Sequence, residues 1–339
     1  MRRWLNDAIR ALSVAAGLGA LVLLYRTFGL DDVVAAFTRL RPPYLIAALA
    51  LGCAVRLGYS LRWWCVARVL GDAPGLPRLV AARLAGDAIG AVVPSARVAG
   101  DPLRIALVYA DGVDGARAGA GVAIDRVLEV VGSALCCIAY VAVFVSTHAL
   151  AWSRASRVVL VSMGLLLGGL ALLVGLLRRG RRPLSPLLRT ILPARTMRRA
   201  WFAVLERAEN DLIGFFHAGP SGFVWGVVGS LLIEALTVLE YHYLLTAFGL
   251  VIDLPTLLAM LVVSGLVRAT PVPAALGALE AGQVALLGAA SGRPDIGFVI
   301  GVVLRLHETW WTTVGFAALS ARGLSLARLR VLTTGKAVG

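Results

Sequence analysis

The stretch that decides the fold is GDAIGAVVPSARVAGDPLRIAL, Gly86 to Leu107, followed by DRVLEVVG from Asp125. It is apolar enough to lie in a membrane, yet Pro94 and several glycines interrupt it. It also carries charged side chains that are costly at membrane depth: Arg97, Asp101, Arg104, Arg126 and Glu129. Irregular backbone at that depth must be buried in protein or line a wet cavity, so the stretch predicts a broken helix facing a polar interior.

A second stretch repeats this pattern, VRATPVPAALGALEAGQVALL (Val267 to Leu287) followed by VVLRLHETWW. Aligned without gaps at an offset of 179, its rare residues coincide with those of the first: Pro94 with Pro273, Asp101 with Glu280, Arg126 with Arg305 and Glu129 with Glu308 (273 − 94, 280 − 101, 305 − 126, 308 − 129). Matches of Ala, Gly and Leu are common by chance here, but four rare residues in one register favour an internal duplication. The predicted helix breaks or hinges are Pro94, Gly100, Pro271, Pro273 and Gly277.

The composition indicates a membrane protein. Of the 339 residues, 59% are hydrophobic and only 15% are charged, whereas soluble domains are about half apolar and about a quarter charged. Several apolar runs reach the ~20 residues that span a bilayer. The sequence therefore predicts one all-α polytopic membrane domain over residues 1–339, with no room for a separate soluble catalytic domain.

No motif for a cofactor or a metal is present. The four cysteines show no CxxC spacing, the four histidines show no HxxxH or HExxH spacing, and there is no Walker loop, GxSxG or dinucleotide fingerprint. We therefore expect no cofactor and no metal, and no enzyme activity of a recognised type.

The net charge of +14 comes almost wholly from arginine, because Lys336 is the only lysine. The arginines crowd the loops beside apolar runs, which is typical of the positive-inside bias and not of nucleic-acid binding. The N-terminus, the basic loop after residue 178 and the C-terminus are thus expected to be cytoplasmic. Arginine with abundant Ala and Gly is typical of a GC-rich bacterial genome, so the expected location is the bacterial inner membrane.

The spans predict an inverted repeat. We expect full spans near residues 9–25, 44–70, 119–145, 158–177, 223–248 and 296–319, a short outer-surface helix at 31–43 and an inner-surface amphipathic helix within 195–216. The charge bias is satisfied only if the broken stretches 79–112 and 255–290 are re-entrant, one from each face. Repeat one then covers 44–147, a connecting span and basic segment cover 148–218, and repeat two covers 219–321 with opposite orientation. In such folds the substrate site lies near the midplane.

The charged residues inside these spans are the candidate site. Arg126/Glu129 and Arg305/Glu308 are i, i+3 pairs on one helix face, which either neutralise each other structurally or serve function. Arg56–Glu234 and Arg62–Glu240 are predicted cross-repeat bridges, with a snorkelling, interfacial Arg62 as the favoured alternative. Because guanidinium suits phosphate and stays charged when buried, the candidate substrate-binding residues are Arg56, Asp101, Arg104, Arg126, Glu129, Glu280, Arg305 and Glu308.

The chain resembles the flippase-like membrane domain of lysylphosphatidylglycerol synthases and its stand-alone relatives, over about residues 10 to 325. The motifs that carry the resemblance are RLGYSLRWW, PSARVAGDPLR, DRVLEVVG, PVPAALGALEAGQVALL and VVLRLHETWW. The chain departs from the more glycine-rich family element at Ala274-Ala275-Leu276, and it lacks the aminoacyl-transfer domain, so lysine transfer is not implied. Stand-alone relatives include hopanoid-associated members and others linked to isoprenoid-lipid glycosylation.

The resemblance implies lipid movement between leaflets. We expect an anionic phospholipid or isoprenoid headgroup to be held by Arg104, Arg126 and Arg305, with Asp101 and Glu280 orienting them or responding to protons. Two other classes stay open: an intramembrane lipid-modifying transferase with Asp101 or Glu280 as base, and a non-transporting partner of a lipid-synthesis complex.

Overall fold

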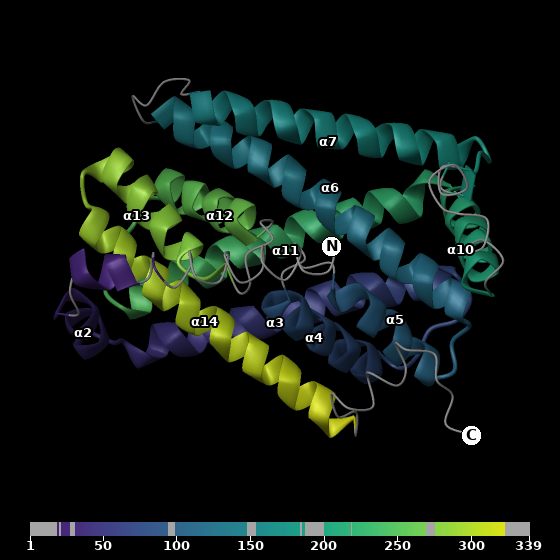
Figure 1. Ribbon diagram of the computed structural model, residues 1–339, viewed down its shortest axis with the longest axis horizontal. Helices are drawn as coiled ribbons and strands as arrows, with labels where there is room; N and C mark the ends of the chain where they lie inside the picture. Colours follow the sequence, from purple (N-terminus) through teal and green to yellow (C-terminus); the bar gives the residue numbers. More distant parts are fainter. Residues whose placement is uncertain are drawn as a thin grey trace, which may run out of the picture.

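The structure is a computed structural model that describes residues 19, 22–27, 31–93, 99–147, 154–183, 185–186, 200–217, 219–268 and 275–322. The secondary structure of these residues is helical, without strands (Figure 1). The helices are α2 (Asp31–Thr38), α3 (Pro42–Val69), α4 (Leu76–Val92), α5 (Gly100–Ala110), α6 (Gly115–Thr147), α7 (Arg154–Arg178), α10 (Ala200–His217), α11 (Pro220–Ala247), α12 (Leu254–Arg268), α13 (Ala278–Ser291) and α14 (Pro294–Ala321).

Among the described helices, α3, α6, α7 and α11 are long and apolar enough to cross a membrane. Helix α14 is as long as α3, with 28 residues, but carries Arg305, His307 and Glu308 near its centre. The prediction of an all-α polytopic membrane protein is confirmed, and the observed helix bounds differ from the predicted spans by a few residues. The span predicted at 9–25 lies largely outside the described residues.

Each broken stretch consists of two short helices that pack against each other, α4 with α5 and α12 with α13. At 1.5 Å per residue the longest, α4, with its 17 residues, measures about 26 Å, which is short of a ~30 Å hydrocarbon core. Pro94, Pro271 and Pro273 lie outside the described residues. Gly277 caps α13 with φ +70°, a left-handed conformation that favours glycine. Entry of the two helix pairs from opposite membrane faces stays a prediction.

The order of helices recurs in the two halves. The starts of α11, α12, α13 and α14 follow those of α3, α4, α5 and α6 by 178 or 179 residues (220 − 42, 254 − 76, 278 − 100, 294 − 115). The packing is reciprocal as well, because α4 packs on α14 of the other half and α12 packs on α6. In Figure 1 the α4/α5 and α12/α13 pairs lie toward opposite ends of the molecule.

The corresponding helices α3 and α11 run antiparallel. Arg56 contacts Glu240, a Cβ on Gly58 would lie 3.0 Å from Ile233, and Arg62 contacts Ser230, so the partner's number falls as the residue number rises. A repeat related by an axis along the membrane normal would place them parallel, whereas an axis in the membrane plane inverts one half. The two halves therefore have the arrangement of an inverted repeat.

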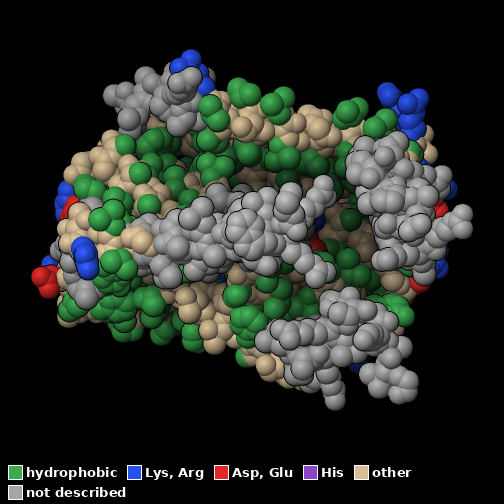
Figure 2. All heavy atoms as spheres, viewed as in Figure 1, with side chains coloured by type: hydrophobic (Ala, Val, Ile, Leu, Met, Phe, Trp, Pro, Cys, Tyr) green, Lys and Arg blue, Asp and Glu red, His purple; other side chains and the backbone are tan. Residues whose placement is uncertain are grey.

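The remaining described helices lie outside this pair of halves. Helix α7 packs on α6 and α10, and exposes Val161, Leu165 and Leu172. Figure 2 shows hydrophobic side chains over much of the described surface of one face, with most Arg, Asp and Glu side chains toward its two ends. This distribution fits a bilayer around the middle of the molecule.

Candidate functional site

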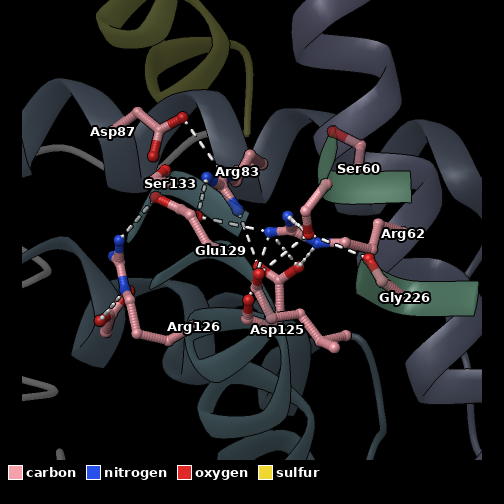
Figure 3. Close-up of polar contacts among 12 residues, drawn as sticks. Ser60, Arg62, Arg83, Asp87, Asp125, Arg126, Glu129, Ser133 and Gly226 are labelled. Atoms are coloured by element: carbon pink, nitrogen blue, oxygen red, sulfur yellow. Dashed lines mark hydrogen bonds and ion pairs between the residues drawn. The ribbon is translucent and has the colours of Figure 1, made fainter. Parts of the chain in front are cut away.

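A buried carboxylate, Asp125 of α6, gathers three arginines from three other helices. Its Oδ1 accepts from Arg62 Nε at 2.9 Å, and its Oδ2 accepts from Arg83 Nη1 and Arg104 Nη2, both at 2.7 Å. Asp125 is wholly buried, and the arginine side chains are at most 4% exposed. Figure 3 shows Arg62 and Arg83 converging on Asp125 and Glu129. We call Asp125, Arg62, Arg83 and Arg104 the ionic hub.

The ionic hub overturns one prediction from the sequence. The sequence predicts that Arg62 snorkels or bridges to Glu240, but its side chain is 4% exposed, and its Nη1 donates to Ser230 of α11 at 2.8 Å. Because α3 and α11 are antiparallel, residue 62 meets residue 230 and not residue 240. The same geometry sends Arg56 to Glu240, at 3.1 Å, in place of the predicted Glu234.

In each half, an arginine on the long helix is held by an acid on the short helix before it. Arg126 donates to both oxygens of Asp101 at 2.7 and 3.2 Å, and its Nη1 reaches Glu129 at 2.9 Å. Bidentate arginine–carboxylate pairs fix geometry as well as charge. This pair therefore ties α5 to α6.

The equivalent residues of the second half repeat the arrangement. Arg305 donates to both oxygens of Glu280 at 2.8 and 3.0 Å, and lies 3.5 Å from Glu308. Its Nη2 also donates to the Ala275 carbonyl at 2.8 Å, which fixes the backbone before α13. The i, i+3 proximity of Arg126/Glu129 and Arg305/Glu308 is thus confirmed.

A third group of polar contacts lies between the halves. Glu240 of α11 is 1% exposed and contacts both Arg56 of α3 and Nε2 of His307 of α14, the latter at 2.7 Å. The Arg56 guanidinium also lies 3.8 Å from the centre of the Trp311 ring, a cation–π distance. Gly52 makes room for this group, since a Cβ there would lie 2.5 Å from Glu240 Oε1.

A cavity of about 160 Å³ opens where these groups meet. Its walls come from both halves, α3, α4 and α6 on one side and α11, α12 and α14 on the other. The charged residues that line it are Arg56, Arg83, Asp87, Arg126, Glu129, Glu240, Arg268 and Glu308, four of each sign, together with His307. Every arginine that lines the cavity is therefore paired with an acid. The cavity is polar and charge-balanced, and it can accommodate a group with hydrogen-bond acceptors.

The predicted site residues divide into two groups. Arg56, Arg126, Glu129 and Glu308 line the cavity. The other four do not line it; Arg104 is 1% exposed, 4.2 Å from the Trp63 ring centre. These four are Asp101, Arg104, Glu280 and Arg305. Gly100 lies within α5 and meets Gly86 closely, since a Cβ on Gly100 would lie 2.0 Å from the Gly86 carbonyl oxygen.

Sequence reasoning missed several lining or supporting residues. Arg83 joins Asp125 and Glu129, and Arg268 of α12 donates to Glu308 at 3.2 Å and to the Tyr241 hydroxyl at 2.7 Å. The available signal was their charge within an apolar run. Among the described residues, no three His, Cys, Asp or Glu side chains lie close enough to hold a metal ion.

An all-helical chain with several apolar helices and buried ion pairs around a cavity between inverted halves is a multi-pass membrane protein. The chain belongs to the family of the lysylphosphatidylglycerol synthase TM region, whose model matches residues 10–315. It is also similar to a UPF0104 membrane protein of Methanothermobacter thermautotrophicus, with 25% identity over 333 residues, 94% of this chain and 96% of the relative.

Proposed function

We propose that the protein moves a lipid between the two leaflets of the bacterial inner membrane, with the lipid headgroup in the cavity and its tails in the bilayer. The observation that carries the proposal is the position of the cavity, enclosed by charged side chains at the boundary between two inverted halves. In transporters built from inverted repeats, the substrate site lies at that boundary, and rocking of one half against the other exposes it to each side in turn. Membership of a lipid-associated membrane family supports the same reading.

The headgroup would be recognised by the arginines that are accessible from the cavity. The Arg56 and Arg126 side chains are 21% and 27% exposed, and both line the cavity. Among the described residues, Arg56 donates to oxygen acceptors through Nη1, so its Nε and Nη2 can donate to a phosphoryl oxygen of the headgroup. Arg104 and Arg305 do not line the cavity and act as positioning residues.

Lipid movement can be tested with purified protein in liposomes that contain a fluorescent phospholipid, with quenching of the outer leaflet as the readout. The variants Arg56→Gln and Arg126→Gln remove a lining charge, and we expect each to slow lipid movement at least tenfold. Arg293→Gln is the matched control, because Arg293 forms an exposed pair with Asp295 away from the cavity. Wild-type rates in both lining variants would refute the role of the cavity.

The same preparation separates transport from catalysis. Movement between leaflets has no meaning in detergent micelles, where an intramembrane transferase would still convert its lipid. We expect mass spectrometry of lipids incubated with the protein in micelles to show no new species. Appearance of a modified lipid would favour an enzyme and refute the proposal that translocation is the primary activity.

A further inference from the structure

Glu234, which is partly buried, differs from the acids of the site described above. It lies at the centre of α11, the fifteenth of 28 residues (234 − 220 + 1), and α11 is one of the candidate spans. Within the described part of the chain, its hydrogen-bond partner is a neutral group, the Ser133 hydroxyl of α6, which donates to Glu234 Oε1 at 2.6 Å. Every other acid of the site has an arginine at ion-pair distance: Asp87, Asp101, Asp125, Glu129, Glu240, Glu280 and Glu308.

The Glu234–Ser133 pair lies one helical turn from the cavity on both helices that carry it. Glu129, four residues before Ser133 on α6, lines the cavity, and so does Thr237, three residues after Glu234 on α11. Residues three or four apart share a helix face. The Glu234–Ser133 pair therefore lies next to the cavity, on the helix faces of α6 and α11 that also carry its lining residues.

The charged and titratable neighbours do not supply a counter-ion. Those within electrostatic range are Tyr59 and Arg62 of α3, Glu129, Cys136, Cys137 and Tyr140 of α6, and Arg268 of α12. Both arginines donate to other groups: Arg62 donates to the Asp125 carboxylate, the Asp125 carbonyl and the Ser230 hydroxyl. Arg268 donates to Glu308 and to the Tyr241 hydroxyl. Glu129 adds negative charge nearby, which disfavours a second carboxylate.

An ionised carboxylate without a cation at this depth is costly, and such a group takes up a proton instead. We propose that Glu234, with Ser133, is a proton-binding site that couples lipid movement to the proton gradient. The carboxylate gains one proton from the side to which the cavity is open and releases it to the other side in the alternate state. This coupling rests on the proposed function, whereas the protonated state of Glu234 does not.

The protonated state can be tested without transport. Dicyclohexylcarbodiimide is an apolar reagent that reacts with protonated carboxyl groups: the carboxyl O–H adds across a C=N bond, and the adduct rearranges to a stable N-acylurea. We expect peptide mass spectrometry of the treated wild-type protein at neutral pH to locate the adduct on Glu234. Glu234→Gln should abolish it, and Glu240→Gln, which alters an acid already paired with Arg56, should leave it unchanged. An adduct on another acid with Glu234 unmodified, or no adduct, would overturn the assignment.

Coupling is tested in liposomes with a pH difference of one unit across the membrane. One proton per lipid shifts the steady-state ratio of lipid between leaflets by about tenfold, because one pH unit corresponds to about 1.4 kcal/mol. We expect this shift in the wild type and an unshifted ratio in Glu234→Gln, which still equilibrates lipid without a gradient. A wild type that moves lipid but ignores the gradient overturns the coupling alone. A wild type that moves no lipid overturns the proposed function, and the carbodiimide result then decides on Glu234.

Discussion

Replacing Asp125 by Asn tests the ionic hub at its centre. The wild-type carboxylate accepts from Arg62 at Oδ1 and from Arg83 and Arg104 at Oδ2. An Asn amide of nearly the same shape has one acceptor oxygen and one NH₂ donor group. Whichever way the amide is turned, its NH₂ faces at least one guanidinium donor, and three arginines lose their shared negative charge.

The expected loss is large. Removing one partner of a buried ion pair costs about 3–5 kcal/mol, because an uncompensated buried charge remains. Loss of an ordinary interhelical hydrogen bond in a membrane protein would cost only about 0.6 kcal/mol on average. The loss expected for a buried ion pair is therefore several times the loss expected for a neutral hydrogen bond. We expect Asp125→Asn to lower the stability of the folded protein by at least about 3 kcal/mol.

Thermal unfolding of the purified protein in detergent, followed by tryptophan fluorescence, measures this loss. Asp295→Asn is the matched control, since Asp295 is 35% exposed beside Arg293 and such surface pairs contribute about 0–1 kcal/mol. The double variant Asp125→Asn/Arg104→Met should recover part of the loss, because it also removes one unpaired charge. If Asp125→Asn melted within the range of the control, a buried charge hub would be the wrong explanation.

Further substitutions test how the first half packs, within itself and against α14. Gly100→Ala places a Cβ 2.0 Å from the Gly86 carbonyl oxygen, and overpacking of this kind costs about 1–3 kcal/mol. We therefore expect a lower melting temperature and less folded protein on size-exclusion chromatography. The control, Gly229→Ala, meets no atom within 4 Å and should be neutral or slightly stabilising. An ion pair between Asp111 and Arg322, at 2.8 Å, joins the ends of α5 and α14. Asp111→Arg or Arg322→Asp alone should therefore lower the melting temperature, whereas the charge-swapped double variant should restore it. Absence of any recovery would show that the contact does not hold these helices together.

Residue patterns predicted the helices and the groups within each helix. The apolar runs predicted α3, α6, α7, α11 and α14 to within a few residues, because length and hydropathy decide whether a segment can span a bilayer. Spacing along one helix predicted the Arg126/Glu129 and Arg305/Glu308 contacts for the same local reason. Contacts between helices required knowledge of which faces meet, and the sequence offset does not supply it.

The predicted bridges Arg56–Glu234 and Arg62–Glu240 show where the offset fails. It identifies equivalent positions, but equivalent positions in an inverted repeat lie at opposite ends of an antiparallel helix pair. Along antiparallel helices, the residue number on α11 falls as the residue number on α3 rises. Arg56 therefore meets Glu240, and Arg62 meets Ser230.

The internal repeat in the sequence did not predict the ionic hub, because the hub exists in one half only. At the offset of 179, the hub residues Arg83, Arg104 and Asp125 correspond to Val262, Gln283 and Leu304. The second half is neutral there, with Leu304 wholly buried and the Gln283 amide donating to Ser264 at 3.0 Å. By contrast, the bidentate pairs Asp101–Arg126 and Glu280–Arg305 occur in both halves. The shared pairs are what the common fold requires, tying each short helix to its long helix. The hub is an addition to the first half, so the two halves are alike in architecture but differ in how their buried charge is held.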